Sequence, residues 1–113
     1  MNEVMARPVT MVFAGLDPTG GAGLQADIEA IASMGCHTAP IATCLTVQTT
    51  HHVQEVVPVE AALVIQQARA VLEDMPVSAF KIGVVASVEM VEAIHSILHD
   101  YSGIPVVLDP VLA

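Results

Sequence analysis

The chain has 113 residues, so it can form one domain at most. Its 12 acidic and 3 basic side chains give a formal net charge of -9, which excludes the clustered positive surface that nucleic-acid binding requires. Hydrophobic residues make up 54 % of the chain and the mean hydropathy is +0.68, a high value for a free-standing domain of this size. No apolar run approaches the roughly 20 residues of a membrane span. We therefore expect no membrane partner, and apolar surface that faces either a missing C-terminal half or a second copy of the chain.

Cysteines and histidines give no sign of a metal site. Cys36 and Cys44 fit no disulfide or metal-ligand spacing, and the N-terminus lacks a signal-peptide pattern. These features predict two buried free thiols and a cytoplasmic location. His95 and His99 are four residues apart, but His99 falls on the outer face of its predicted helix, which favours two solvated histidines over a metal pair.

Strand and helix patterns alternate along the chain after a short lead-in, Met1–Pro8, that is predicted to be disordered. Apolar runs predict strands at Val9–Gly15, His37–Val47, Ala79–Val85 and Pro105–Leu108. Apolar periodicity predicts helices at Gly21–Met34, Glu60–Asp74 and, capped by Ser87, up to Asp100. His51 and His52 are expected in a loop after the second strand, where an exposed turn is favoured over a lid contact. This alternation predicts right-handed βαβ crossovers and an α/β fold, a mostly parallel sheet with flanking helices.

A glycine-rich turn connects the first strand to the first helix. Gly20, Gly21 and Gly23 allow a ligand to approach backbone N–H groups, and the helix N-terminus leaves such donors unpaired. These donors favour an anion or a polar heteroatom. The same glycines could instead serve only to close a tight turn and to pack the helix against the strand. The turn alone does not separate these two interpretations.

Two charged residues fall at inward positions of predicted elements. Asp27 shares the inward face of the first helix with Leu24, Ile28, Ile31 and Met34. A carboxylate there must be paired or hydrogen-bonded, so Asp27 either contacts a ligand or binds backbone N–H groups of the turn. Lys81 lies in an apolar strand, and it is either paired with a carboxylate or directed at a phosphate. On the last helix, Val91, Ile94 and Leu98 are expected to face inward.

Polar residues or glycines follow each of the four predicted strands. They are Gly15 and Asp17, then Thr46 and Gln48, then Gly83 within the end of the third strand, and finally Asp109. In parallel sheets, ligands bind beyond the carboxyl ends of the strands. Four separate strands therefore indicate one ligand crevice.

Four segments together resemble the hydroxymethylpyrimidine and phosphomethylpyrimidine kinases of thiamine biosynthesis, which are members of the ribokinase-like superfamily. They are Ala14–Asp27, Leu45–Thr49, Lys81–Gly83 and Val107–Val111. The resemblance implies that residues 1–113 are the N-terminal portion of a single ribokinase-like kinase domain. It implies an enzyme that uses ATP and Mg²⁺ to phosphorylate 4-amino-5-hydroxymethyl-2-methylpyrimidine and then its monophosphate.

The resemblance also implies which residues bind the aminopyrimidine. Gln48 matches a glutamine that binds the pyrimidine, and its carboxamide can accept from the exocyclic amine while it donates to the adjacent ring nitrogen. Gly15 and Asp27 match positions that line the same pocket. Asp109 matches an acidic position near the metal and the phosphates. No residue matches the catalytic base, which in this family lies beyond the position of Ala113, as does the glycine-rich anion hole.

Two departures from the family pattern leave the substrate open. Val84 stands where many members carry a methionine over the pyrimidine, and Thr49–His52 replaces a common Asn-Thr-Arg-Gly. A pyridoxal or pyridoxine-type kinase is therefore the alternative enzyme. Phosphoryl transfer needs charge neutralisation, which three cationic side chains do not supply, so the chain is expected to be inactive alone. A non-catalytic pyrimidine-binding fragment, or a structural half that needs its complement even to bind, are the alternatives from a different class.

Overall fold

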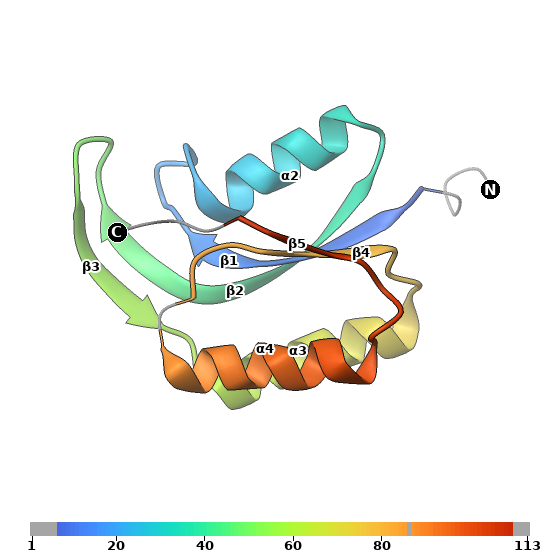
Figure 1. The fold of residues 1–113 in the computed structure, drawn as a ribbon. Coiled ribbons are helices and arrows are strands. Elements are labelled where there is room, and N and C mark those ends of the chain that lie inside the picture. The colour runs from blue at the N-terminus through green and yellow to red at the C-terminus, as the bar shows by residue number, and fades with distance from the viewer. Residues whose placement is uncertain (1–6, 86, 110–113) are drawn as a thin grey trace.

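The computed structural model describes residues 7–85 and 87–109, which form one sheet with helices on both faces (Figure 1). The strands are β1 (Val9–Leu16), β2 (His37–Gln48), β3 (Val53–Pro58), β4 (Ala79–Ile82) and β5 (Val106–Leu108). The helices are α2 (Gly23–Ser33), α3 (Ala61–Asp74) and α4 (Val88–Asp100). Most of the predicted lead-in lies outside the described residues, as do the last two residues of the Val107–Val111 segment.

β1 occupies the centre of the sheet, whose strand order is β3-β2-β1-β4-β5. It pairs in parallel with β2 and β4, and β4 pairs in parallel with β5. Both faces of β1 are covered, since Met11, Val12 and Phe13 are all 0 % exposed. The predicted α/β fold, a mostly parallel sheet with flanking helices, is confirmed.

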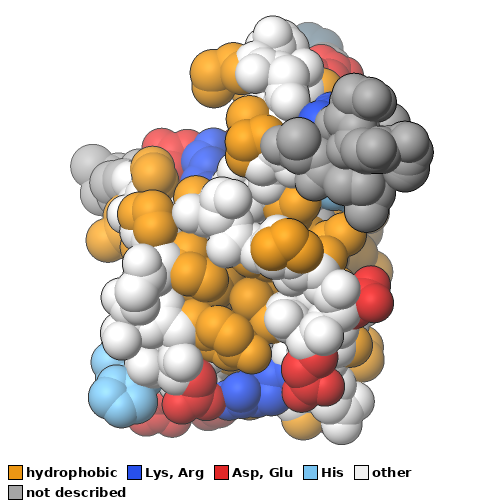
Figure 2. Space-filling view, turned by 90° about the vertical axis from the view of Figure 1, so that its right-hand side faces the viewer, with side chains coloured by type: hydrophobic (Ala, Val, Ile, Leu, Met, Phe, Trp, Pro, Cys, Tyr) orange, Lys and Arg blue, Asp and Glu red, His pale blue; other side chains and the backbone are white. Residues whose placement is uncertain are grey.

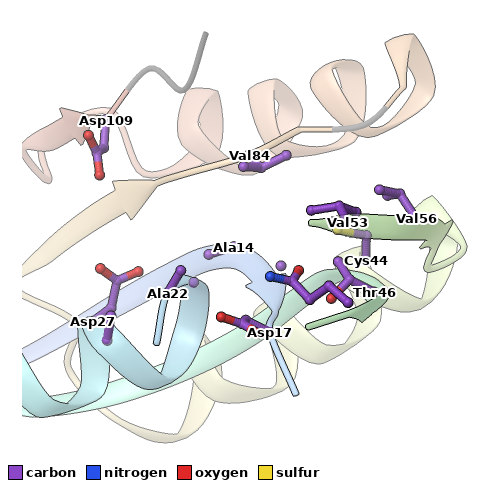
Figure 3. Close-up of a pocket in the computed structure, with 14 residues that line it drawn as sticks. Ala14, Asp17, Ala22, Asp27, Cys44, Thr46, Val53, Val56, Val84 and Asp109 are labelled. Atoms are coloured by element: carbon purple, nitrogen blue, oxygen red, sulfur yellow. The ribbon is translucent and has the colours of Figure 1, made fainter. Parts of the chain in front are cut away.

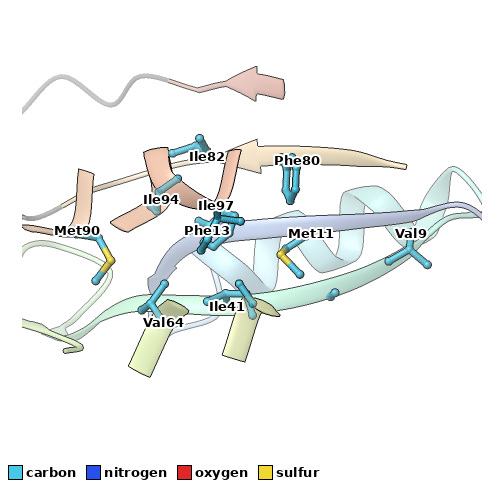
Figure 4. Close-up of a cluster of buried hydrophobic side chains, with 12 residues drawn as sticks. Val9, Met11, Phe13, Ile41, Val64, Phe80, Ile82, Met90, Ile94 and Ile97 are labelled. Carbon is cyan, nitrogen blue, oxygen red and sulfur yellow. The ribbon is translucent and has the colours of Figure 1, made fainter. Parts of the chain in front are cut away.

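The main hydrophobic core lies between the sheet and the layer formed by α3 and α4 (Figure 4). Phe13 of β1 and Phe80 of β4 have ring centroids 6.2 Å apart at the middle of this core. Val64 and Ala68, four residues apart on α3, are buried against it. A smaller cluster under α2 contains Val12, Ala14 and Leu24. The two faces of the sheet are therefore covered very unequally.

Three predictions of burial are wrong. Met34 is 74 % exposed because α2 ends at Ser33 and the chain turns through Gly35, whose φ is +79°. Val91 is 54 % exposed, because α4 instead turns Met90, Ala93, Ile94 and Ile97 toward the core. Ile94 is buried as expected, and Leu98 packs against the core. Of the two free cysteines, Cys44 is buried and Cys36 is only half-buried.

The sequence pattern missed one strand. β3 pairs with β2 in antiparallel register, so the loop that contains His51 and His52 is the connection of a hairpin. All six residues of β3 are exposed, and its sequence shows no alternation of apolar and polar residues. On the other side of β1, β4 ends at Ile82. Gly83, which was predicted within the end of this strand, therefore lies one residue beyond it. The hairpin extends past the layer of helices at the carboxyl ends of the parallel strands (Figure 1).

Apolar side chains remain exposed at one edge of the sheet. Val106, Val107 and Leu108 of the edge strand β5 are 41 %, 57 % and 68 % exposed. Figure 2 shows further hydrophobic side chains gathered at the centre of the end opposite the hairpin, with charged groups below them. Within the described part of the chain, no helix is long and apolar enough to span a membrane. Part of the chain's high apolar content thus lies on an exposed sheet edge, the kind of edge that proteins cover with another element.

Candidate ligand pocket at the carboxyl ends of the strands

A pocket of about 520 Å³ lies where the parallel strands end, between the start of α2 and the β2–β3 hairpin (Figure 3). Its lining includes the five residues that the resemblance to the kinase family pointed to: Gly15, Asp27, Gln48, Val84 and Asp109. Of the other residues predicted at the strand ends, Asp17 and Thr46 line the pocket and Gly83 does not. The lining residues come from separate parts of the chain and meet because the parallel strands end at the same edge of the sheet. Their roles toward a ligand remain predictions.

Asp17 organises the glycine-rich turn beside this pocket. Its side chain is 7 % exposed, and one carboxylate oxygen accepts hydrogen bonds of 2.8 Å from both the backbone N–H and the hydroxyl of Thr19. These bonds lower the pKa of Asp17, with smaller contributions from the backbone N–H groups of Ala22 and Gly21. The turn therefore already holds an anion of its own, which favours the structural interpretation of the turn over external anion binding.

Two glycines make close contacts in the wall of the pocket. Gly23 has a φ of +61°, and a Cβ placed on it would lie 2.2 Å from the carbonyl oxygen of Gly15. A Cβ on Gly15 would lie 2.8 Å from the sulfur of Cys44. Both glycines and Cys44 line the pocket, and burial raises the pKa of the Cys44 thiol, which keeps it neutral. Close packing at Gly15 and Gly23 thus shapes this wall.

A lysine lies between two carboxylates that line the pocket. The ammonium of Lys81 forms an ion pair with Asp27, and its Nζ lies 3.5 Å from a carboxylate oxygen of Asp109. Burial of the ammonium lowers the pKa of Lys81, but the bond and charge of Asp27 and the charge of Asp109 outweigh this, so the pKa is raised. The structure thus settles Lys81 as a paired lysine. The carboxylate of Asp27 is therefore paired with Lys81 and not with backbone N–H groups of the turn, while its contact with a ligand stays a prediction.

Gln48 and a set of valines form the opposite end of the pocket. Gln48 is the last residue of β2, is half-buried, and pairs in register with Val53 of β3. Val53 and Val56 line the pocket from β3, and Val84 lines it from the connection between β4 and α4 (Figure 3). One carboxamide among apolar side chains suits a flat, polar-edged ring. Sequence reasoning missed the two β3 valines because it missed their strand.

The acidic groups at the pocket do not form a metal site by themselves. No group of three His, Cys, Asp or Glu side chains in residues 7–85 and 87–109 is placed to hold a metal ion. The Asp109 side chain is 60 % exposed at the pocket and could supply one oxygen ligand. His95 and His99 stack at a centroid distance of 6.4 Å, and both are exposed, as solvated histidines would be.

Comparison with known sequences points to one enzyme family. A family model described as phosphomethylpyrimidine kinase matches residues 17–113. A hydroxymethylpyrimidine/phosphomethylpyrimidine kinase of Escherichia coli is 37 % identical over 108 residues, which cover 96 % of this chain and 41 % of that protein. The chain therefore spans about two fifths of the length of this relative.

Solved structures show the same likeness. A phosphomethylpyrimidine kinase from Clostridium difficile superposes with a TM-score of 0.84 at 35 % identity, over 91 % of this chain and 45 % of that one. An ADP complex of Bacillus subtilis pyridoxal kinase superposes with a TM-score of 0.86 at 24 % identity, over 95 % of this chain and 42 % of that one. The second likeness shows the fold alone, and the fold is that of the ribokinase-like kinases.

Proposed function

The chain belongs to the phosphomethylpyrimidine kinase family, and from this premise we propose that it forms the pyrimidine-binding part of a thiamine-biosynthesis kinase. The complete enzyme would transfer a phosphoryl group from ATP to 4-amino-5-hydroxymethyl-2-methylpyrimidine and then to its monophosphate. The observation that carries the proposal is the pocket that brings Gln48 together with three valines from two elements. We place this enzyme in the cytoplasm.

In this proposal Gln48 recognises the edge of the ring and the valines contact its faces. The carboxamide oxygen accepts from the exocyclic amine, and its N–H donates to the neighbouring ring nitrogen. Figure 3 places Val53 and Val56 at one end of the pocket and Asp27 and Asp109 at the other. A ring held at Gln48 would then extend its hydroxymethyl group toward the two carboxylates. Gly15 leaves room for the ring because it has no side chain.

We propose ATP and Mg²⁺ as the phosphoryl donor and the metal ion because the chain belongs to a kinase family. The Bacillus subtilis relative is an ADP complex, which supports a nucleotide donor. A bound Mg²⁺ would neutralise the charge of the phosphates. Asp109 is the described residue that we propose near it, but the described residues do not assemble a metal site, so we assign no step to the ion.

We infer that the 113 residues bind the aminopyrimidine without turning over ATP, which is the second candidate function. Lys81 is the cation that the structure places next to the pocket wall, and it is already paired with Asp27 and Asp109. The developing charge of a transferred phosphoryl group needs cations or N–H donors that are free to meet it. No described residue is assigned as the catalytic base.

A substrate of the vitamin B6 type is favoured by two departures from the common family sequence. Val84 is shorter than the methionine common at this position, and the Thr49–His52 connection differs from the common family sequence. A pyridoxal ring lacks the exocyclic amine that Gln48 would recognise. It would therefore depend less on Gln48 than an aminopyrimidine does.

The experiment compares ligands and turnover on the purified 113-residue chain. Calorimetric titration with the aminopyrimidine alcohol is expected to show binding, and an excess of pyridoxal should not displace it. An ATP turnover assay on the same sample is expected to show no activity. Pyridoxal binding in place of the aminopyrimidine would move the assignment to the B6 type. Turnover would show that the chain is a complete enzyme.

A further inference from the structure

Thr43 connects two walls of the pocket without lining it. Its side chain is 0 % exposed in β2, and its hydroxyl donates a hydrogen bond of 3.0 Å to the carbonyl oxygen of Val84. Its own carbonyl accepts a bond of 3.0 Å from the backbone N–H of Val59, just beyond β3. Thr43 therefore joins β2, the end of the hairpin and the connection between β4 and α4.

Val84 lies just beyond the last residue that is hydrogen-bonded to β1. The backbone N–H of Gly83 still donates to Phe13 at 2.8 Å, which extends the β1–β4 ladder by one residue beyond Ile82. Val84 follows, with its side chain at the pocket and 40 % exposed. Among the hydrogen bonds of the described residues, the bond from Thr43 is the one in which Val84 takes part. The Thr43 hydroxyl thus ties this residue to β2.

We propose that Thr43 is a positioning residue that sets the width of the ring-binding pocket. β2 carries Gln48 five residues further along, and the Thr43–Val84 bond fixes the valine of one wall relative to this strand. A pocket whose walls are held in place before the ligand arrives binds more tightly, since less ordering is left for the binding step. This proposal rests on the proposed function, because it assumes that the ring binds between Gln48 and Val84.

A second threonine in the same strand provides a matched control. Thr38 is 7 % exposed, and its hydroxyl is buried without a hydrogen-bond partner in the described residues. β2 therefore buries two threonine hydroxyls, and the one of Thr43 is bonded to the pocket wall. Thr38→Val removes an unpaired buried group of the same kind, so we expect a fold that is unchanged or more stable.

The binding experiment titrates the full 113-residue chain and three variants with the aminopyrimidine alcohol. Thr43→Val should weaken binding about tenfold, which corresponds to about 1.4 kcal/mol, because it leaves the Val84 carbonyl without its donor. Thr43→Ser keeps the hydroxyl and should restore affinity to within about twofold of the wild type, as should Thr38→Val. Equal affinity of Thr43→Val and the wild type would overturn the proposal.

A measurement without ligand separates this proposal from the proposed function. The carbonyl ¹³C resonance of Val84 should move upfield in Thr43→Val and return in Thr43→Ser, and the wild-type Thr43 hydroxyl proton should be protected from exchange. An unprotected hydroxyl proton, or an unchanged Val84 resonance, would overturn the positioning role even if Thr43→Val folds poorly. Failure of the wild type to bind aminopyrimidine, with these signals as expected, would count against the proposed function alone.

Discussion

The two faces of the sheet are held by different interactions. Twelve buried residues form a continuous hydrophobic core under α3 and α4, whereas three form the cluster under α2. On the α2 side, backbone contact at Gly23, the Asp17 turn and the Lys81 ion pairs join the elements. Hydrophobic burial is nondirectional, while polar ties fix individual groups in place. The first face supplies most of the apolar burial, and the second supplies the geometry of the pocket.

On the α2 side of the sheet, a substitution at the contact between Gly23 and Gly15 should destabilise the protein most. Gly23→Ala should lower the free energy of unfolding by about 3 kcal/mol or more, because it combines a positive φ with a Cβ directed at a backbone oxygen. Gly35→Ala is the matched control, since Gly35 has a φ of +79° with nothing within 4 Å of its Cβ position. It should lose only about 1 kcal/mol by urea unfolding. Equal losses would contradict the role of close backbone contact.

The Lys81 ion pairs test whether buried charge matters more at the pocket than on the surface. Lys81→Met should lower the free energy of unfolding by about 1 to 3 kcal/mol, because Asp27, whose side chain is 12 % exposed, would lose its counter-charge. Arg69→Ala breaks an exposed pair with Asp100 and should lose under about 1 kcal/mol.

The pH dependence of the same pair follows from the raised pKa of Lys81. Its stabilising contribution is complete below the unfolded value of 10.5 and is lost as pH rises through the higher folded value. Stability of the wild type should therefore fall more steeply than that of Lys81→Met above pH 10.5. Parallel curves for the two proteins would contradict the pairing.

Substitution of Asp17 should have the smallest effect on stability, and this effect should appear at acidic pH. Its lowered pKa means that the folded turn contributes stability above the ordinary value of 3.8, and loses it as pH falls through the lower folded value. Asp17→Asn should flatten the fall in melting temperature below pH 4, as measured by circular dichroism. An unchanged acid limb would mean that the carboxylate does not hold the turn.

The sequence was sufficient to predict strands that are marked by an apolar run and the residues that meet where those strands end. Continuous apolar runs in β1 and β2 predicted the parallel sheet, and the strand ends predicted the convergence of Gly15, Gln48 and Asp109. It failed for β3, whose exposed residues show no alternation, and so it missed Val53 and Val56. Pattern alone also could not tell which carboxylate pairs with Lys81 and which holds the turn, because both partnerships depend on three-dimensional contact.

The most direct test of the pocket is a calorimetric titration of the wild-type chain with the aminopyrimidine alcohol, beside Gln48→Ala. Gln67→Ala, which truncates an exposed glutamine of α3, is the matched control. The account predicts that Gln48→Ala loses about tenfold or more in affinity, while Gln67→Ala binds as the wild type does. A folded wild-type chain that binds no aminopyrimidine, or binds it equally well without the Gln48 carboxamide, would contradict the account.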